Sequence, residues 1–337
     1  MIFMEFYLPV IWGLLIAVAI GFYVVLDGFD LGVGILFPFH RGEAARDQMM
    51  ASIAPYWDGN ETWLILGGGA LWIAFPQAYA VVMPGVYLPV VIMLLALVLR
   101  GVAFEFRHVS KPHHGRWEVA FAGGSTVAAF CQGLVLGTVI EGLPMQNGAF
   151  AGGPFEFVRP FAFLCGLGVV AGYALLGAGW LMVKTEGPVH ETARHLARPL
   201  FGALIAFIAV VSLWTPLAMP WIGARWFSVP MIWYLWPVPL LTLLIAWIAL
   251  RGIERDKGLR TFVCVLALFL LCFAGLGIST FPYLVPPTLD VWQAAASPDS
   301  QMFMLIGAVA MLPIILAYTA FVYWTFRGKV LPGQSYH

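Results

Sequence analysis

Residues 7–37, YLPVIWGLLIAVAIGFYVVLDGFDLGVGILF, form an apolar run that only Asp27 and Asp30 interrupt. The run exceeds the ~20 residues that an α-helix needs to cross the hydrocarbon of a bilayer. No Lys or Arg precedes it and two acids lie within it, which argues against a cleavable signal peptide. The stretch therefore predicts a membrane-spanning helix that carries carboxylates inside the bilayer.

The rest of the chain has the same character. Of the 337 residues, 61% are hydrophobic and only 10% are charged, and the mean hydropathy is +0.90. A soluble enzyme of this length would need far more polar surface. Lys plus Arg and Asp plus Glu balance at 17 each, which excludes a disordered or nucleic-acid-binding chain. The composition predicts an all-α integral membrane protein, because a β-barrel would show short alternating strands.

Apolar runs separated by short charged loops predict nine spans within a single transmembrane domain, residues 1–337. Pro76, Pro84 and Gly85 break a nearly continuous stretch between the second and third spans, so eight spans is the alternative count. The nine predicted spans are approximately 7–37, 50–75, 79–107, 117–141, 160–184, 197–219, 229–250, 260–281 and 302–326.

The charges between the spans predict the orientation. With nine spans, almost every Lys and Arg falls on one side, and the opposite loops hold only Arg159 and Arg225. Cytoplasmic loops of membrane proteins carry the excess of positive charge. We therefore expect the N-terminus outside and the C-terminus in the cytoplasm. If the second and third spans were one span, the Lys and Arg residues would no longer fall on one side of the membrane. The loops predicted to be cytoplasmic are 41–48, 108–116, 185–196 and 251–260.

Ionisable residues inside spans are costly and usually mark a polar path or an interface. Counted at ~1.5 Å per residue, Asp27 and Asp30 lie roughly 10–15 Å from the inner surface, and Asp58 and Glu61 lie roughly 12–17 Å from it. Each pair is three residues apart and so shares a helix face. Arg100 lies at about 10 Å depth and Glu105 at the inner rim. Four carboxylates and one guanidinium are thus expected to share one level in the cytoplasmic half.

Two interpretations of this level remain open. Arg100 could neutralise one acid, with hydrogen bonds from Asn60 and Thr62, in a network that only fixes the packing of the first three spans. Four acids against one Arg leave an excess of negative charge, so some of them must hold protons or face water. Such carboxylates suit a proton entry path. The proton-path candidates are Asp27, Asp30, Asp58, Glu61, Arg100 and Glu105.

Histidines and cysteines give no sign of a metal or haem site in this chain. No histidine lies at the centre of a span, where an axial haem ligand is usual, so solvated loop histidines are expected. The four cysteines lie inside spans without zinc-site spacing, and we expect them to be free packing residues. We predict no metal site and no catalytic residue. The histidines are His40, His108, His113, His114, His190, His195 and His337.

Two further patterns concern packing. Trp57 and Trp63 flank the acidic face of the second span, where either ring could stack on a quinone or on a partner chain, although ordinary packing is the simpler interpretation. Three glycine pairs have the GxxxG spacing that allows close helix approach, although 36 glycines make chance matches common. These pairs are Gly28 with Gly32, Gly133 with Gly137, and Gly168 with Gly172.

The motifs resemble subunit II of the cytochrome bd family of bacterial quinol oxidases, including its cyanide-insensitive branch. The resemblance rests on LDGFDLGVG at 26–34 and, above all, on WDGNETWLILGGGAL at 57–71. It covers the whole chain, strongly over 1–110 and loosely after that. Further matches are AFP at 74–76, YA at 79–80, Arg100, FP at 281–282 and PIILAYTA at 313–320.

The resemblance implies a complex in the bacterial inner (cytoplasmic) membrane that oxidises quinol and reduces dioxygen to water in an electrogenic reaction. Subunit I of that complex carries haem b and haem d. Subunit II is similar in fold, with two four-helix bundles and a peripheral helix. It contributes to a cytoplasmic proton route past acids matching Asp27, Asp30 and Asp58. Some members hold a quinone in subunit II, and the sequence leaves open both that site and a small accessory subunit.

Three functions are therefore compared. The first is a haem-free subunit of a quinol oxidase, which is not catalytic alone, supports subunit I and contributes a cytoplasmic proton path to the oxygen-reduction site. Its partners would be subunit I, membrane lipid and quinol. The second is a stand-alone proton-coupled membrane transporter, which would more often place its acids near the midplane. The third is a purely structural scaffold. The resemblance favours the first.

Overall fold

The computed structural model describes residues 2–110 and 114–333, and it is almost entirely helical. Its elements in chain order are α1 (Ile2–Leu36), η1 (Phe37–Phe39), α2 (Glu43–Ile53), α3 (Trp57–Ala74), α4 (Pro76–Gly85), α5 (Tyr87–Val109), α6 (His114–Glu141), β1 (Met145–Gln146), β2 (Ala149–Phe150), α7 (Pro160–Lys184), α8 (Pro188–Ala218), α9 (Pro220–Phe227), α10 (Met231–Leu235), α11 (Pro237–Glu254), α12 (Gly258–Thr280), β3 (Tyr283–Val285), β4 (Leu289–Asp290) and α13 (Pro298–Thr325).

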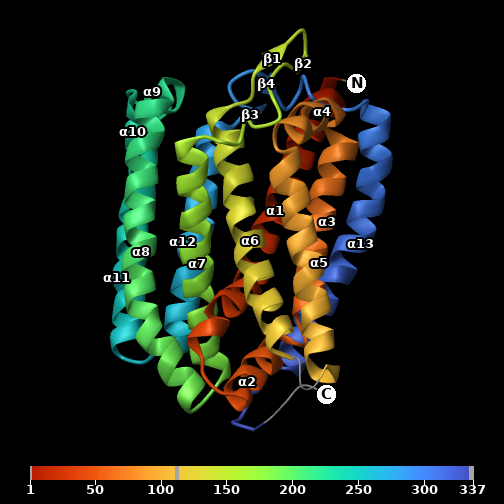
Figure 1. The fold of residues 1–337 in the computed structure, drawn as a ribbon. Coiled ribbons are helices and arrows are strands. Elements are labelled where there is room, and N and C mark those ends of the chain that lie inside the picture. The colour runs from red at the N-terminus through yellow and green to blue at the C-terminus, as the bar shows by residue number, and fades with distance from the viewer. Residues whose placement is uncertain (1, 111–113, 334–337) are drawn as a thin grey trace.

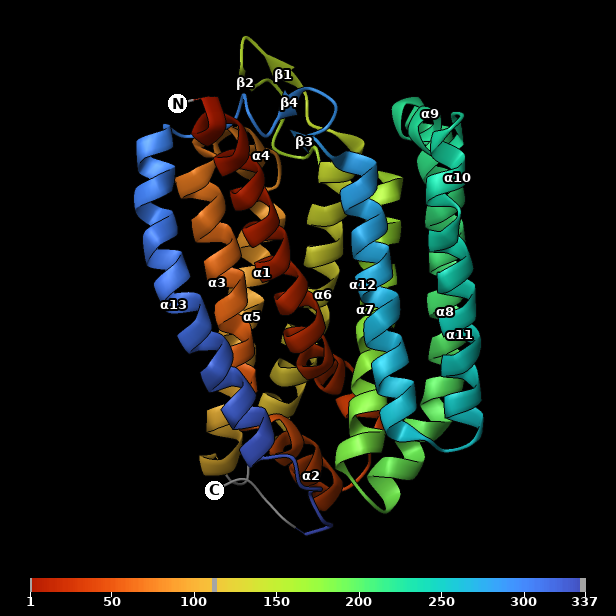
Figure 2. The same ribbon diagram turned by 180° about the vertical axis from the view of Figure 1, so that it is seen from behind.

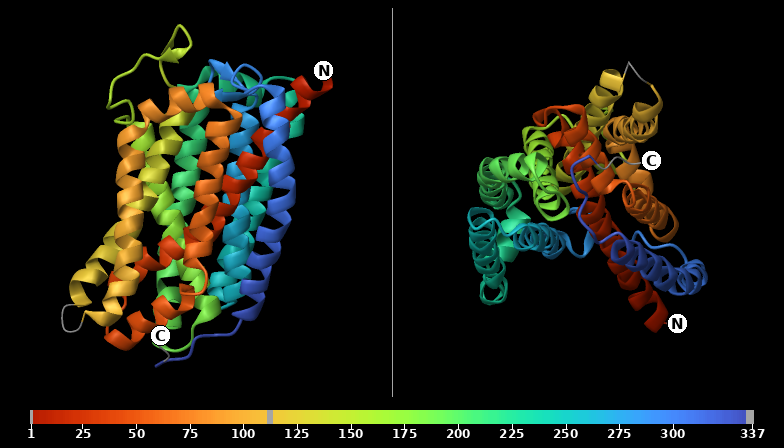
Figure 3. Two further views of the ribbon diagram at one scale, coloured as in Figure 1. Left: turned by 90° about the vertical axis from the view of Figure 1, so that its right-hand side faces the viewer. Right: turned by 90° about the horizontal axis from the view of Figure 1, so that it is seen from below.

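The long helices stand side by side and alternate in direction, with α1 running obliquely between its neighbours (Figures 1 and 2). The two β-hairpins, α4, α9 and the N-terminus lie at one end, which we call the hairpin end. Helix α2 and the end of α13 lie at the other, the α2 end, as the side view in Figure 3 also shows. The bundle therefore has two distinct ends.

Eight helical segments of the described chain are long and apolar enough to cross a membrane. Helix α3 is not among them, because Asp58, Asn60 and Glu61 make its first turns polar, but it lies within the bundle against α1 and α13. The predicted all-α membrane class is confirmed. The eight segments are Met4–Phe39, Tyr87–Arg107, His114–Glu141, Pro160–Lys184, Pro188–Ala218, Met231–Glu254, Gly258–Thr280 and Pro298–Thr325.

Several predicted boundaries were wrong. The second span, 50–75, begins too early, because a turn at 54–56 containing Pro55 separates α2 from α3. The third, 79–107, contains the end of α4 and a break at Val86 before α5. The loop 185–196 is mostly the first turns of α8, which begins nine residues before 197 on an amphipathic segment. The loop 41–48 likewise contains the start of α2. Short polar helices outside the bilayer leave no hydropathy signal, which explains these errors.

Glycines bring the central helices into direct backbone contact. A Cβ on Gly32 of α1 would lie 1.9 Å from the Tyr173 carbonyl oxygen of α7, and one on Gly28 would lie 2.8 Å from the Tyr173 ring. A Cβ on Gly133 of α6 would lie 2.5 Å from the Cys165 carbonyl oxygen of α7. These GxxxG glycines do mark packing faces.

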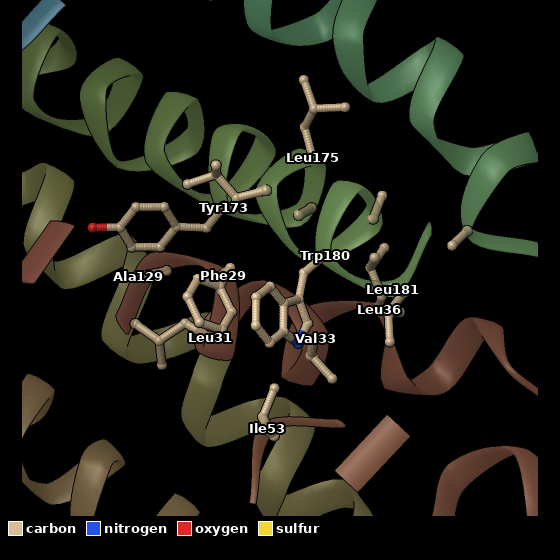
Figure 4. Close-up of a cluster of buried hydrophobic side chains, with 14 of the residues drawn as sticks. Phe29, Leu31, Val33, Leu36, Ile53, Ala129, Tyr173, Leu175, Trp180 and Leu181 are labelled. Carbon is tan, nitrogen blue, oxygen red and sulfur yellow. The ribbon is translucent and has the colours of Figure 1, made fainter. Parts of the chain in front are cut away.

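The main core surrounds the contact between α1 and α7 and includes residues of α2, α5, α6, α8, α11 and α12. Figure 4 shows Phe29 beside Trp180, with Val33 and Ile53 close by. The Phe29 and Trp180 rings stack with centroids 4.2 Å apart. Close backbone approach and aromatic stacking therefore hold α1 in a set rotation, which decides where Asp27 and Asp30 point.

Candidate functional site

Arg100 of α5 lies at the centre of a buried ion cluster. Its side chain is 1% exposed, and its Nη1 donates to Asp27 Oδ1 at 3.0 Å and to Glu61 Oε1 at 2.6 Å. The Trp57 ring lies under the guanidinium, 5.8 Å from Cζ to the ring centroid. One cation thus joins α1, α3 and α5, and it binds two acids rather than the single one expected from the sequence.

Asp30 has a different partner. Its carboxylate is fully buried, and Oδ2 accepts a hydrogen bond of 2.7 Å from Asn60 Nδ2 on α3. Asn60 Oδ1 in turn accepts a hydrogen bond of 3.1 Å from the Tyr323 hydroxyl on α13. The Asn60 amide is therefore oriented from both sides, and its N–H group points at Asp30.

The cluster contains more acid than base and several unpartnered polar atoms. Within the described residues, Asp27 Oδ2, Asp30 Oδ1, and Arg100 Nε and Nη2 are buried without a hydrogen-bond partner. Buried polar atoms usually pair or bind ordered water, because leaving them unpaired is costly. Three carboxylates around one guanidinium also favour bound protons over full ionisation. The site is therefore suited to holding water and exchangeable protons.

Two predicted members stand apart from this cluster. Asp58, in the first turn of α3, and Glu105 of α5 are both exposed on the surface of this chain. Asp58 is near enough to Glu61 for its charge to act on that carboxyl. The Thr62 hydroxyl donates to Gly59 O of its own helix, at 2.6 Å, and not to an acid. Rotation of a helix about its axis separates residues that share one depth.

Sequence reasoning missed a polar chain beside Asp27. Gln132 Nε2 of α6 donates to the Tyr23 hydroxyl at 2.6 Å, and the Tyr173 hydroxyl of α7 donates to Gln132 Oε1 at 2.7 Å. Tyr23 precedes Asp27 by one helical turn and its hydroxyl interacts with that carboxyl. The sequence signals for this polar chain were the four-residue spacing of Tyr23 and Asp27 and the amide of Gln132 within the predicted span 117–141.

A second ion cluster, also missed, lies at the α2 end. Arg107 of α5 bonds Glu118 of α6 at 3.1 Å and also pairs with Asp47 of α2. Arg46 of α2 pairs with the other Glu118 oxygen. Four charged side chains thus tie α2 to the α5–α6 hairpin. Their charges balance, so this cluster explains packing without any need for bound protons.

His40 corrects the expectation of solvated loop histidines. Its side chain is 2% exposed, and its ring Nδ1 lies 3.0 Å from Leu36 O. Burial lowers the pKa of His40 below its ordinary value, which favours the neutral ring at physiological pH. His113 and His337 lie outside the described residues.

The two tryptophans of the second predicted span both have ring partners within this chain, and Trp57 lies 5.3 Å from the Phe104 ring between centroids. Trp63 is 2% exposed and stacks on Phe22 with centroids 4.6 Å apart, so its ring lies inside the bundle. All four cysteines are free, as expected. Over residues 2–110 and 114–333, no three His, Cys, Asp or Glu side chains are grouped as metal ligands would be.

The apolar helices and the buried ion cluster define a multi-pass helical membrane protein with a titratable interior. Residues 8–326 match the family model described as cytochrome bd terminal oxidase subunit II, and this chain belongs to that family. It is therefore a multi-pass membrane subunit of a bacterial respiratory oxidoreductase complex, the cytochrome bd quinol oxidase, and has a subunit I as its partner.

Known relatives agree along almost the whole chain. It is 30% identical to cytochrome bd-I ubiquinol oxidase subunit 2 of Escherichia coli, over 95% of this chain and 94% of the relative. It is 30% identical to cytochrome bd ubiquinol oxidase subunit 2 of Bacillus subtilis, over 95% and 96%. The solved bd oxidase of Geobacillus thermodenitrificans has a chain of the same fold, with a TM-score of 0.78, 17% identity, and coverage of 95% of this chain and 98% of that one.

Proposed function

We propose that this chain is a haem-free subunit that supports a haem-carrying subunit I and supplies protons from the cytoplasm to its oxygen-reduction site. The observation that carries the proposal is the buried excess of carboxylate around Arg100, with Asp27, Asp30 and Glu61 within one cluster. The cluster lies toward the α2 end, because Asp27 and Asp30 are near the end of α1 and Glu61 is near the start of α3. A transporter acting alone is disfavoured, because oxidase subunits match along nearly the full length.

The α2 end is the cytoplasmic end in this proposal, and the arrangement is a nine-span one. Counting α3 as a span places the start of α1 at one end and the end of α13 at the other, as the ribbon runs in Figure 1. Lys and Arg gather at the α2 end, whereas Arg159 and Arg225 lie at the hairpin end, where they bond Gly142 O at 3.0 Å and Ile278 O at 2.8 Å. The positive-inside rule then puts the N-terminus in the periplasm of a bacterial inner membrane. The same proposal includes the division of the nine spans into two four-helix bundles and a peripheral helix.

A cysteine-labelling experiment tests this orientation. Single cysteines replacing Arg41 and Lys257 at the α2 end should resist an impermeant thiol reagent added to right-side-out vesicles. A cysteine replacing Gly153 at the hairpin end should label at once in the same vesicles. Opening the vesicles should make all three reactive, which controls for burial. Rapid labelling at position 41 in sealed vesicles would reverse the orientation.

Subunit I is proposed to cover the face formed by α3, α5 and α13. Gly59, Gly68 and Gly69 of α3 have nothing within 4 Å of a built Cβ, so another helix can approach this face closely. Asp58 is exposed on the same helix. On this arrangement Asp58 faces the subunit boundary and can pass protons between the partner and Glu61. In this proposal subunit I carries haems b and d, and the complex as a whole binds quinol and reduces oxygen electrogenically. A small accessory subunit would be a further partner.

Purification of the tagged chain under mild detergent tests the assignment itself. We expect subunit I to co-purify with it, together with the visible bands of reduced haems b and d. Expressed without that subunit, the chain should be colourless, because no described histidine lies at the centre of a span. A reduced-minus-oxidised haem band from the chain alone would contradict the haem-free assignment. Recovery of an active, partner-free transporter would replace the proposal altogether.

Asp58→Asn tests the proton role at the boundary. The variant keeps the shape of the side chain but removes its titrating group, so oxygen uptake per haem should fall about tenfold or more. Asp58→Glu should retain more activity because it keeps an acid. The measurement is oxygen uptake in membranes, with assembly scored from the haem spectrum. Full turnover per haem in Asp58→Asn would exclude an essential proton role for this residue.

A further inference from the structure

Lys184, the last residue of α7, is a buried cation with no carboxylate partner among the described residues. Its side chain is 4% exposed. Its Nζ donates to the Tyr56 hydroxyl at 3.2 Å, to Gly328 O at 2.7 Å and to Phe326 O. An ammonium group satisfied by backbone carbonyls instead of a carboxylate requires an explanation, because burial of a charge is costly.

The explanation lies in the carbonyl groups that Lys184 binds. They belong to the end of α13 and the residues after it, and α13 has no basic residue in its last turn. The free carbonyls at a helix C-terminus carry partial negative charge and favour a cation. Arg327 donates to Trp324 O of this last turn at 2.7 Å, and Lys184 of α7 adds a second cation at the carbonyls that follow it.

The residues after α13 form an anchored segment, Phe326–Val330, which we call the C-terminal strap. Val330 N donates to Lys184 O at 2.7 Å, and Val330 forms a parallel bridge with Thr185. Gln48 Nε2 of α2 donates to Val330 O at 2.8 Å. The strap thus fastens the end of α13 to α7 and α2, below the bundle in Figure 2.

Within this chain helix α13 packs by one face only, and the strap is what fastens its end to α7 and α2. All 28 of its residues are described, and only Gln301 near its beginning is buried. Near its other end, the Tyr323 ring lies 4.5 Å from the Tyr56 ring, and the Tyr323 hydroxyl bonds Asn60 Oδ1 at 3.1 Å. That hydroxyl holds the oxygen of the Asn60 amide, while Asn60 Nδ2 donates to Asp30 and, at 3.3 Å, to Leu26 O.

We infer that Lys184 is a positioning residue: it fixes the C-terminal strap, holds Tyr323 on Asn60, and thereby keeps the Asn60 N–H group on Asp30. Its effect on turnover rests on the proposed proton role of Asp30, whereas its effect on the strap does not. Without the strap, Tyr323 leaves Asn60 Oδ1 and the amide can rotate. An amide oxygen facing Asp30 opposes ionisation of that carboxyl.

The strap is tested directly by the accessibility of a cysteine replacing Val330, whose backbone bonds survive the change. Inside-out vesicles carrying the assembled complex are treated with an impermeant maleimide, and background from native cysteines is measured in the complex without Cys at 330. Lys184→Met should speed labelling about tenfold or more. Lys329→Met is the matched control: it removes a lysine from the same strap, but one half-exposed and paired with Glu186, so labelling should stay within about twofold.

The pH profile of oxygen uptake per haem tests the link to Asp30. The charged or titratable groups that act on Asp30 are Arg100, Asp27, Glu61, Tyr56 and Tyr323. Lys184→Met and Tyr323→Phe should both move the acid limb of the profile to higher pH, by about one unit, because ionised Asp30 loses its donor. Tyr323→Phe should do so with slow, parent-like labelling at 330. Lys184→Arg keeps the cation and should restore both readouts in part.

The outcomes separate the two levels of the proposal. Parent-like labelling in Lys184→Met, in a complex with normal haem content, overturns the strap assignment. Faster labelling with an unmoved pH profile in both variants overturns the link to Asp30. If Lys184→Met fails to assemble, the labelling rate of Lys184→Arg, expected between that of the parent and that of a released strap, tests the strap, and the pH profile of Tyr323→Phe tests the link to Asp30. Unchanged turnover in Asp30→Asn would instead defeat the proposed proton function and leave the labelling result standing.

Discussion

Arg100→Gln is expected to prevent stable assembly of the complex. The change leaves Asp27 fully buried and Glu61 largely buried without their shared cation. Removing one partner of a buried ion pair typically costs about 3–5 kcal/mol, because the remaining charge is uncompensated. That cost is a large fraction of the free energy of unfolding of most proteins. The measurement is the yield of haem-containing complex per cell, with thermal unfolding of any complex recovered.

Two further variants separate charge from geometry at Arg100. Arg100→Lys keeps the charge but has a single nitrogen for two acids, so yield should recover in part. Adding Glu61→Gln to Arg100→Gln removes one of the uncompensated acids and should raise the yield above that of the single variant. Wild-type yield and unfolding temperature in Arg100→Gln would show that the acids do not depend on this cation.

Gly32→Ala is expected to have the next largest effect. The added methyl group would lie 1.9 Å from the Tyr173 carbonyl oxygen and 2.7 Å from Gly177 N, both of them backbone atoms of α7. Neither atom can swing away, so α1 and α7 must separate, and overpacking of this kind costs about 1–3 kcal/mol or more. We expect a clearly lower unfolding temperature of the purified complex, with reduced yield.

Gly123→Ala is the matched control for Gly32→Ala. Gly123 is also a helical glycine, in α6, but nothing lies within 4 Å of a Cβ built there. Ala is favoured over Gly in helices, so this variant should unfold at the same or a slightly higher temperature. Equal unfolding temperatures for the two variants would contradict the close contact between α1 and α7.

Helix existence was largely predictable from the sequence, and helix ends were less so. Hydropathy is a local property, so the fifth predicted span, 160–184, has the same bounds as α7. The early part of α8 and the whole of α2 were missed as helices, since polar helices outside the bilayer have no apolar run. Pro55 marks the α2–α3 turn, but a proline alone does not distinguish a turn from a kinked span.

The sequence by itself determined that Asp27, Asp30, Glu61 and Arg100 lie at one depth, because residue spacing and helix rise set depth along a straight span. Only the tertiary structure decided their partners. The contact of Gly32 with α7 sets the rotation of α1, and so Asp27 meets Arg100 while Asp30 meets Asn60. Asp58, at nearly the same depth, points outward instead. The partners of Lys184 were likewise not predictable from spacing along one helix. The carbonyl groups of Phe326 and Gly328 reach Lys184 only when α13 packs against the bundle. Rotation and docking depend on contacts between distant segments, which spacing along one helix does not encode.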